Sequence, residues 1–106
     1  MEVPEIDVTE LARLRPDGIA LIDVRQPDEY TAAHVPGATL VPLAMVPDNL
    51  DRVPTDGPVY VICAKGGRSL KAAEFYRGQG IDAVNVAGGT TAWLDAGQPV
   101  STGMEP

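Results

Sequence analysis

Short apolar runs alternate with helix-like segments along this chain of 106 residues, and that alternation constrains its fold more than any other feature. Residues 19–24 and 59–62 are almost entirely apolar, which is typical of strands buried on both faces. Shorter strands are predicted at 6–8, 39–42 and 82–86, and helices at 9–15, from 27 onward, at 67–77 and at 90–96, with a weakly helical stretch at 45–53. This order of elements predicts an α/β fold, a parallel sheet with helices on both faces.

The size and charge of the chain limit the classes of function. We expect one domain spanning 1–106, with its core at about 4–100 and a frayed tail at 101–106. Fifteen acidic and eight basic side chains give a net charge of −7, which argues against nucleic acid and against an anionic membrane as partners. The first residues do not form an apolar leader, and no apolar run approaches the ~20 residues that span a bilayer. We therefore expect a cytoplasmic protein that acts as a monomer.

The only cysteine, Cys63, stands where the apolar run 59–62 ends. In parallel sheets ligands bind beyond the carboxyl ends of the strands, so Cys63 has the position of a site residue. The helix predicted next offers unpaired backbone N–H groups and positive partial charge. Lys65 and Arg68 add formal charge beside the sulfur, and we expect the thiol to ionise more easily than a free cysteine.

The loop that begins at Cys63 is suited to hold a negative charge. Its two glycines permit a tight turn, in which successive N–H groups can form an anion-binding nest. We predict that Cys63 is the nucleophile and that the loop binds the substrate and the charged covalent product. These binding residues are Ala64, Lys65, Gly66, Gly67, Arg68 and Ser69. A lone buried cysteine is more commonly an inert apolar residue, but the strand end, the glycines and the cations favour a functional thiol.

Three segments of the chain carry a resemblance to a known family. They read DVRQPDEY at 23–30 with HVPGA at 34–38, CAKGGRS at 63–69, and GGTTAW at 88–93 with GQPV at 97–100. In this order they resemble the signatures D-x-R-x-x-x-E-[FY], [GH]-[IV]-P-G-A and G-G-x-x-x-W…G-x-P-V, together with the active loop, of the rhodanese family of sulfurtransferases. The family usually has glycine before the histidine, where this chain has Ala33, and we expect only a small change of geometry.

This resemblance implies a three-layer fold with a central five-stranded parallel sheet, and a two-step reaction without a cofactor or metal. The Cys63 thiolate would attack the outer sulfur of a small anionic donor such as thiosulfate, and an acceptor would then remove that sulfur from the persulfide. Because the chain has no second cysteine, the acceptor must be external: cyanide, a small thiol or the thiol of a partner protein. The positive charge of Lys65 favours the thiosulfate dianion, although a merely solvated lysine is an equally open interpretation.

Two other functions remain open at this stage. A persulfide-relay or sulfur-carrier module would accept sulfur in the same way and release it only to a partner protein. A small phosphatase or arsenate reductase is disfavoured, because the phosphatase loops of known families are longer by one residue.

The residues around the loop are expected to support it. Asp23 and Arg25, at the end of the run 19–24, are predicted to tie that strand to neighbouring loops. Arg68 is predicted to brace the loop while facing an anion, or else to pair with a surface acid such as Glu74. Ser69 is predicted to cap the helix or to donate a hydrogen bond.

Overall fold

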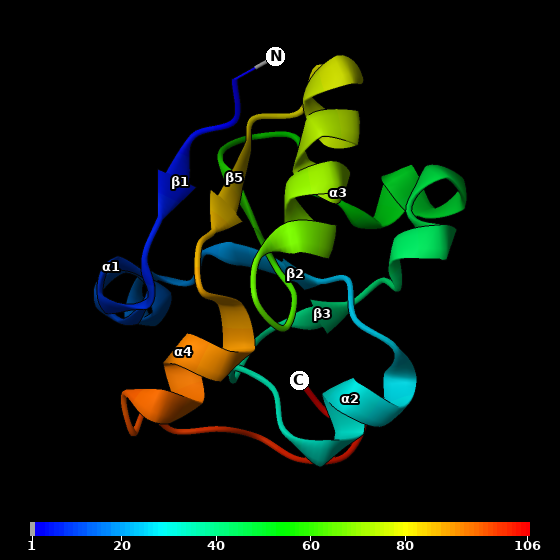
Figure 1. Cartoon of the computed structure of the whole chain (residues 1–106). Helices are drawn as coiled ribbons and strands as arrows, with labels where there is room; N and C mark the ends of the chain where they lie inside the picture. The colour runs from blue at the N-terminus through cyan, green and yellow to red at the C-terminus, as the bar shows by residue number, and fades with distance from the viewer. Residues whose placement is uncertain (1) are drawn as a thin grey trace.

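A central sheet of five parallel strands forms the middle of the molecule in the computed structural model, which describes residues 2–106. The strands are arranged in the order β1-β5-β4-β2-β3 (Figure 1). Their bounds are β1 (Glu5–Ile6), β2 (Ala20–Asp23), β3 (Thr39–Leu40), β4 (Val59–Ile62) and β5 (Ala83–Val86). The predicted parallel sheet of five strands is confirmed, and β4, which leads into the cysteine, lies at its centre.

Within residues 2–106, four α-helices follow strands or turns at about the positions that the periodicity indicates. They are α1 (Val8–Leu14), α2 (Pro27–Ala32), α3 (Gly67–Gly78) and α4 (Gly89–Asp95). The weakly helical stretch consists of 3-10 turns, η2 (Leu43–Met45) and η3 (Pro47–Arg52), with a further 3-10 turn η1 (Arg15–Asp17) after α1. Within residues 2–106 we find no helix with the length and apolar character needed to cross a membrane.

Two apolar clusters, one on each face of the sheet, give the fold its three layers. Successive strand residues point to opposite faces, so Ile22 and Leu21 belong to different clusters. One cluster packs the sheet against α3 and the 3-10 turns through Ala72, Ala73, Tyr76, Val46 and Val53. The other packs it against α1, α2 and α4 through Val8, Leu11, Tyr30 and Trp93. The three-layer architecture is therefore confirmed.

The last residues of the chain, for which the sequence predicts a frayed tail, are instead held against α2. His34 and Ser101 exchange two backbone hydrogen bonds of 2.9 Å, and the Gly103 amide donates to the Thr31 carbonyl at 2.8 Å. The buried His34 ring also has Nε2 at 2.8 Å from the Glu105 carbonyl oxygen. The sequence predicts none of these contacts, because the partners lie about seventy positions away in the chain and leave no local pattern.

Candidate active site

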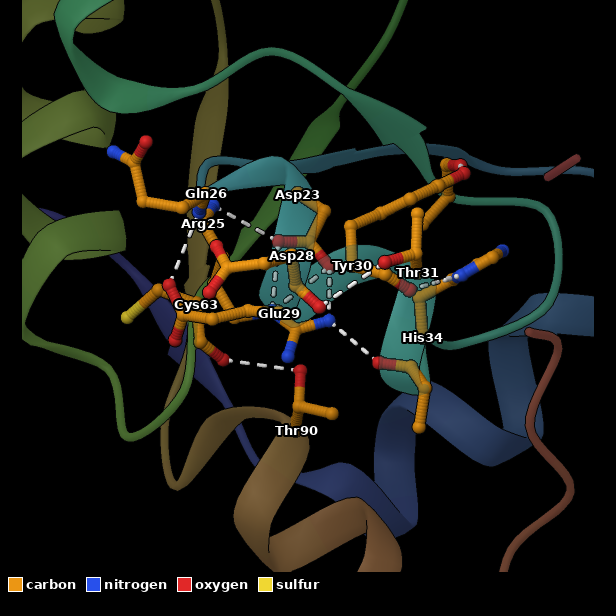
Figure 2. A network of polar contacts seen from close by, with 12 residues as sticks. Asp23, Arg25, Gln26, Asp28, Glu29, Tyr30, Thr31, His34, Cys63 and Thr90 are labelled. Carbon is orange, nitrogen blue, oxygen red and sulfur yellow. Dashed lines mark hydrogen bonds and ion pairs between the residues drawn. The ribbon is translucent and has the colours of Figure 1, made fainter. Parts of the chain in front are cut away.

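The backbone at Cys63 is held by the first turn of α4. The Thr90 amide donates to the Cys63 carbonyl at 2.9 Å, and the Thr91 amide donates to the Ala64 carbonyl at 2.9 Å. The Thr90 hydroxyl adds a third bond, to the Cys63 carbonyl at 3.2 Å (Figure 2). The carbonyls are thus directed toward α4, which leaves the amides of the loop free to turn toward the sulfur.

The sulfur of Cys63 lies inside a turn of backbone N–H groups. The Gly66 amide donates to Sγ across 3.1 Å, and Gly66 has a φ of +108°, a conformation that glycine adopts without strain. Cys63 as a whole is only 1% exposed. The sulfur is therefore at the bottom of the loop, with Lys65 and Gly67 exposed above it.

Burial and hydrogen bonding shift the pKa of the Cys63 thiol in opposite directions, and the effect of the hydrogen bonds is larger. Burial raises the pKa of the Cys63 thiol, whereas hydrogen bonds to the sulfur lower it by more, so the net pKa lies below its ordinary value. The backbone amides of Ser69, Gly66 and Lys65 lower it, and the Ser69 hydroxyl lowers it further whenever its proton is on the side of the sulfur. This is the direction expected of a reactive cysteine.

Ser69 does not cap the helix, contrary to one of the two roles predicted for it. The N-cap of α3 is Gly66, and Ser69 lies buried inside the first turn. Its oxygen is 3.3 Å from the Cys63 sulfur and 2.6 Å from Oδ1 of Asn85 on β5. Ser69 is consequently a part of the sulfur's environment rather than of the helix end.

Arg68 braces the loop, but its partner is Glu29 of α2 and not Glu74. Two parallel hydrogen bonds of 2.7 and 3.0 Å join its guanidinium to the Glu29 carboxylate. The Arg68 hydrogen bonds hold the pKa of Glu29 far below its usual range, at about 2. The same carboxylate accepts from the Gln26 amide at 3.0 Å (Figure 2). The active loop and the start of α2 are thus joined through the Glu29 side chain.

Asp23 and Arg25 form a buried ion pair beside the site. The Arg25 guanidinium donates to both Asp23 carboxylate oxygens at 2.9 to 3.2 Å, and also to the Ala33 carbonyl at 2.8 Å (Figure 2). These bonds tie the end of β2 to the end of α2, which is the supporting arrangement that the sequence predicts. β2 in turn pairs with β4, the strand that ends immediately before Cys63.

Two residues of the site were not among those that the sequence predicts. Glu29 lies in the segment 23–30. Because it comes three residues after Gln26, the sequence alone would give its carboxylate a capping role at the start of the helix. Asn85 is the one polar residue in the strand Ala83–Val86, and a polar side chain in so apolar a run was a usable signal.

Among the described residues 2–106, no three acidic, histidine or cysteine side chains are placed to hold a metal ion.

Comparison with known proteins shows the family to which the chain belongs. A family model for the rhodanese-like domain matches residues 7–96. The chain belongs to the rhodanese-like sulfurtransferase family. A rhodanese-like domain protein from Staphylococcus aureus has a similar structure, with a TM-score of 0.87 and 35% identity, covering 95% of this chain and 99% of that one. The Cys63 loop lies inside the segment 7–96 that the family model matches.

Two curated relatives share most of this rhodanese-like chain. A sulfurtransferase from Allochromatium vinosum is 33% identical over 101 residues, covering 92% of this chain and 94% of that protein. The thiosulfate sulfurtransferase GlpE from Pseudomonas entomophila is 33% identical over 93 residues, covering 87% of this chain and 85% of that protein. These relatives support sulfur transfer as the class of reaction.

Proposed function

We propose that this protein is a thiosulfate sulfurtransferase that carries the transferred sulfur as a persulfide on Cys63. The observation that supports it most directly is the contact of 3.1 Å between the Gly66 amide and the Cys63 sulfur, inside a loop that lowers the pKa of the thiol. An ionised sulfur held by N–H donors is the nucleophile that this reaction needs.

The first step transfers one sulfur atom to the enzyme. The Cys63 thiolate attacks the outer sulfur of thiosulfate and forms a new S–S bond, while the original S–S bond breaks and sulfite leaves with the electron pair. Because Cys63 is 1% exposed, only a donor with a narrow terminal sulfur can reach it, and the rest of the donor must stay at the mouth of the loop. The loop amides that face Sγ are positioned to receive the negative charge of the persulfide.

The second step returns the enzyme to its starting state. Cyanide, or an external thiolate, attacks the outer sulfur of the persulfide, and the Cys63 thiolate is the leaving group. With cyanide the product is thiocyanate. No internal thiol can intercept the persulfide, because Cys63 is the only cysteine of the chain.

Recognition of the donor is assigned to Lys65. Since Arg68 is engaged in two hydrogen bonds with Glu29, the exposed Lys65 is the cation of the loop that we assign to the donor's charge. Lys65→Gln is expected to raise the KM for thiosulfate by up to about fivefold with little change in kcat. Lys71→Gln, which removes another exposed lysine, on α3, is the matched control and should leave both constants unchanged.

The test is steady-state formation of thiocyanate from thiosulfate and cyanide. We expect turnover by the native protein and none by Cys63→Ser, which keeps the side chain's size and removes the nucleophile. If the protein accepts sulfur from thiosulfate but releases it only when a partner protein's thiol is added, the sulfur-carrier function replaces the enzymatic one. If it hydrolyses an aryl phosphate and forms no persulfide, sulfur transfer itself is wrong.

A further inference from the structure

The Ser69 hydroxyl has one proton and two possible acceptors. Its oxygen lies 2.6 Å from Asn85 Oδ1 and 3.3 Å from the Cys63 sulfur. A carbonyl-type oxygen can only accept, so the short contact to Asn85 requires the Ser69 proton. The hydroxyl cannot at the same moment donate to the sulfur.

The orientation of the Asn85 amide is determined by its other neighbours. Its Nδ2 group lies 2.7 Å from the Glu5 carboxylate and 3.3 Å from the Gly66 carbonyl oxygen. Both of these groups are acceptors, so the NH₂ side of the amide must face them. Oδ1 is thereby directed at Ser69, and the amide cannot turn over without losing both contacts.

The sheet places two members of this chain of hydrogen bonds, and helix α3 places the third. Glu5 and Asn85 are directly paired in register on β1 and β5, and Ser69 lies in the first turn of α3. Asn85 is 1% exposed and Ser69 is fully buried, so water does not compete for the hydroxyl proton. The Glu5 backbone, in contrast, lies on an edge strand, and its side chain is exposed.

We propose that Asn85 is a positioning residue that draws the Ser69 proton away from the Cys63 sulfur, with Glu5 holding Asn85 in the orientation that does so. In the resting thiol, the Cys63 S–H donates to the Ser69 oxygen, whose own proton is on the side of Asn85. The thiolate then depends on the backbone amides, and Ser69 can donate to it only by breaking its bond to Asn85. The Cys63 thiolate is therefore more nucleophilic than it would be if it also accepted a hydrogen bond from the Ser69 hydroxyl.

The test is the pH profile of Cys63 alkylation by iodoacetamide, with the ultraviolet absorbance of the thiolate as a second readout. Asn85→Leu removes the competing acceptor and lets Ser69 donate to the sulfur, so the thiol should ionise at lower pH. A hydrogen bond to a charged group corresponds to about a tenfold rise in the thiolate fraction below the pKa. Since nucleophilicity falls as the pKa falls, with a Brønsted coefficient of about 0.4–0.5, the plateau rate at high pH should fall about threefold.

The double variant separates this effect from a general change of the site. In Ser69→Ala the thiol loses the oxygen that accepts its S–H, so it should ionise at the native pH or slightly below it, and adding Asn85→Leu to Ser69→Ala should not lower the ionisation pH further. If Asn85→Leu lowers the ionisation pH equally with and without Ser69, or not at all with Ser69 present, the proposal is overturned.

Glu5 supplies a version of the test that leaves the core intact. Glu5→Ala should shift the alkylation profile in the same direction as Asn85→Leu, because Asn85 loses the partner that orients it. Glu5→Gln keeps an acceptor for Nδ2 and should retain the native profile. A shift in Glu5→Gln as large as that in Glu5→Ala would mean that the charge of Glu5 acts directly, and would refute the positioning role.

This inference rests on the proposed function only in taking Cys63 as the reacting group. Alkylation needs no sulfur donor, so a protein with the predicted profile but without thiocyanate formation would overturn the proposed function and leave the role of Asn85 standing. Normal thiocyanate formation together with an unshifted alkylation profile would overturn the role of Asn85 and leave the proposed function standing.

Discussion

Gly89, at the first position of α4, controls how closely that helix approaches the active loop. Its φ is +59°, and a Cβ at this position would lie 2.4 Å from the Cys63 carbonyl oxygen and 2.6 Å from that of Ala64. Neither oxygen can easily move, because each accepts an amide hydrogen bond from Thr90 or Thr91. Gly89→Ala should therefore disturb the backbone that presents the sulfur.

The magnitude follows from two additive costs. The left-handed conformation costs about 1–2 kcal/mol for a residue with a Cβ, and forcing a methyl group into packed backbone costs about 1–3 kcal/mol. We expect Gly89→Ala to lower the free energy of unfolding by about 2–5 kcal/mol. Gly97→Ala is the matched control, because Gly97 has a φ of +71° but no atom within 4 Å of the place that a Cβ would take, so only the conformational cost remains.

Urea unfolding of the two variants, together with the alkylation rate of Cys63, checks this reasoning. Gly89→Ala should be less stable than Gly97→Ala by about 1–3 kcal/mol, and only Gly89→Ala should change the alkylation rate. Equal losses of stability, with equal alkylation rates, would show that α4 does not hold the loop through close contact at Gly89.

Two further predictions concern a charged side chain and a buried hydroxyl away from the Cys63 sulfur. Glu29 has a pKa of about 2 in the fold against 4.5 in the unfolded chain, so its stabilising contribution is complete above pH 4.5 and is lost as the pH falls toward 2. Glu29→Gln should remove that part of the acid dependence of stability, about 1 kcal/mol for so accessible an ion pair. An acid-unfolding curve that Glu29→Gln leaves unchanged would refute this prediction. Tyr76 is fully buried, burial raises its pKa to about 12, and within residues 2–106 its hydroxyl has no hydrogen-bond partner. Tyr76→Phe should therefore stabilise the protein by about 1 kcal/mol in thermal or urea unfolding, whereas Tyr30→Phe, which loses a bond to the Ala38 carbonyl, should destabilise it, and the same sign for both would contradict the argument.

The elements of the fold were predictable because their signals are local. The apolar runs at 19–24 and 59–62 contain β2 and β4, and the glycine-rich segment after Cys63 leads directly into α3. A strand buried on both faces needs a continuous apolar run, and a tight loop needs glycine, so both leave their mark within a few residues. Even the weak helical pattern at 45–53 corresponds to real structure, as 3-10 turns.

The contacts of the site were less predictable, because their partners are distant in the chain. Arg68 could have paired with Glu74 within its own helix, but the fold brings Glu29 to it from a separation of 39 residues. Ser69 is of a residue type common at helix caps, yet Gly66 takes that position and frees the hydroxyl for the sulfur and Asn85. Side chains with several possible partners are decided by packing, which local patterns do not contain.

We expect Cys63 to take up a single sulfur atom, and the intact mass of the protein measures this uptake directly. After incubation with thiosulfate alone and removal of the donor, the native protein should gain the mass of one sulfur atom, which cyanide then removes. Cys63→Ser should gain nothing under the same conditions. A native protein whose mass never changes with thiosulfate or any other sulfane donor would contradict the account.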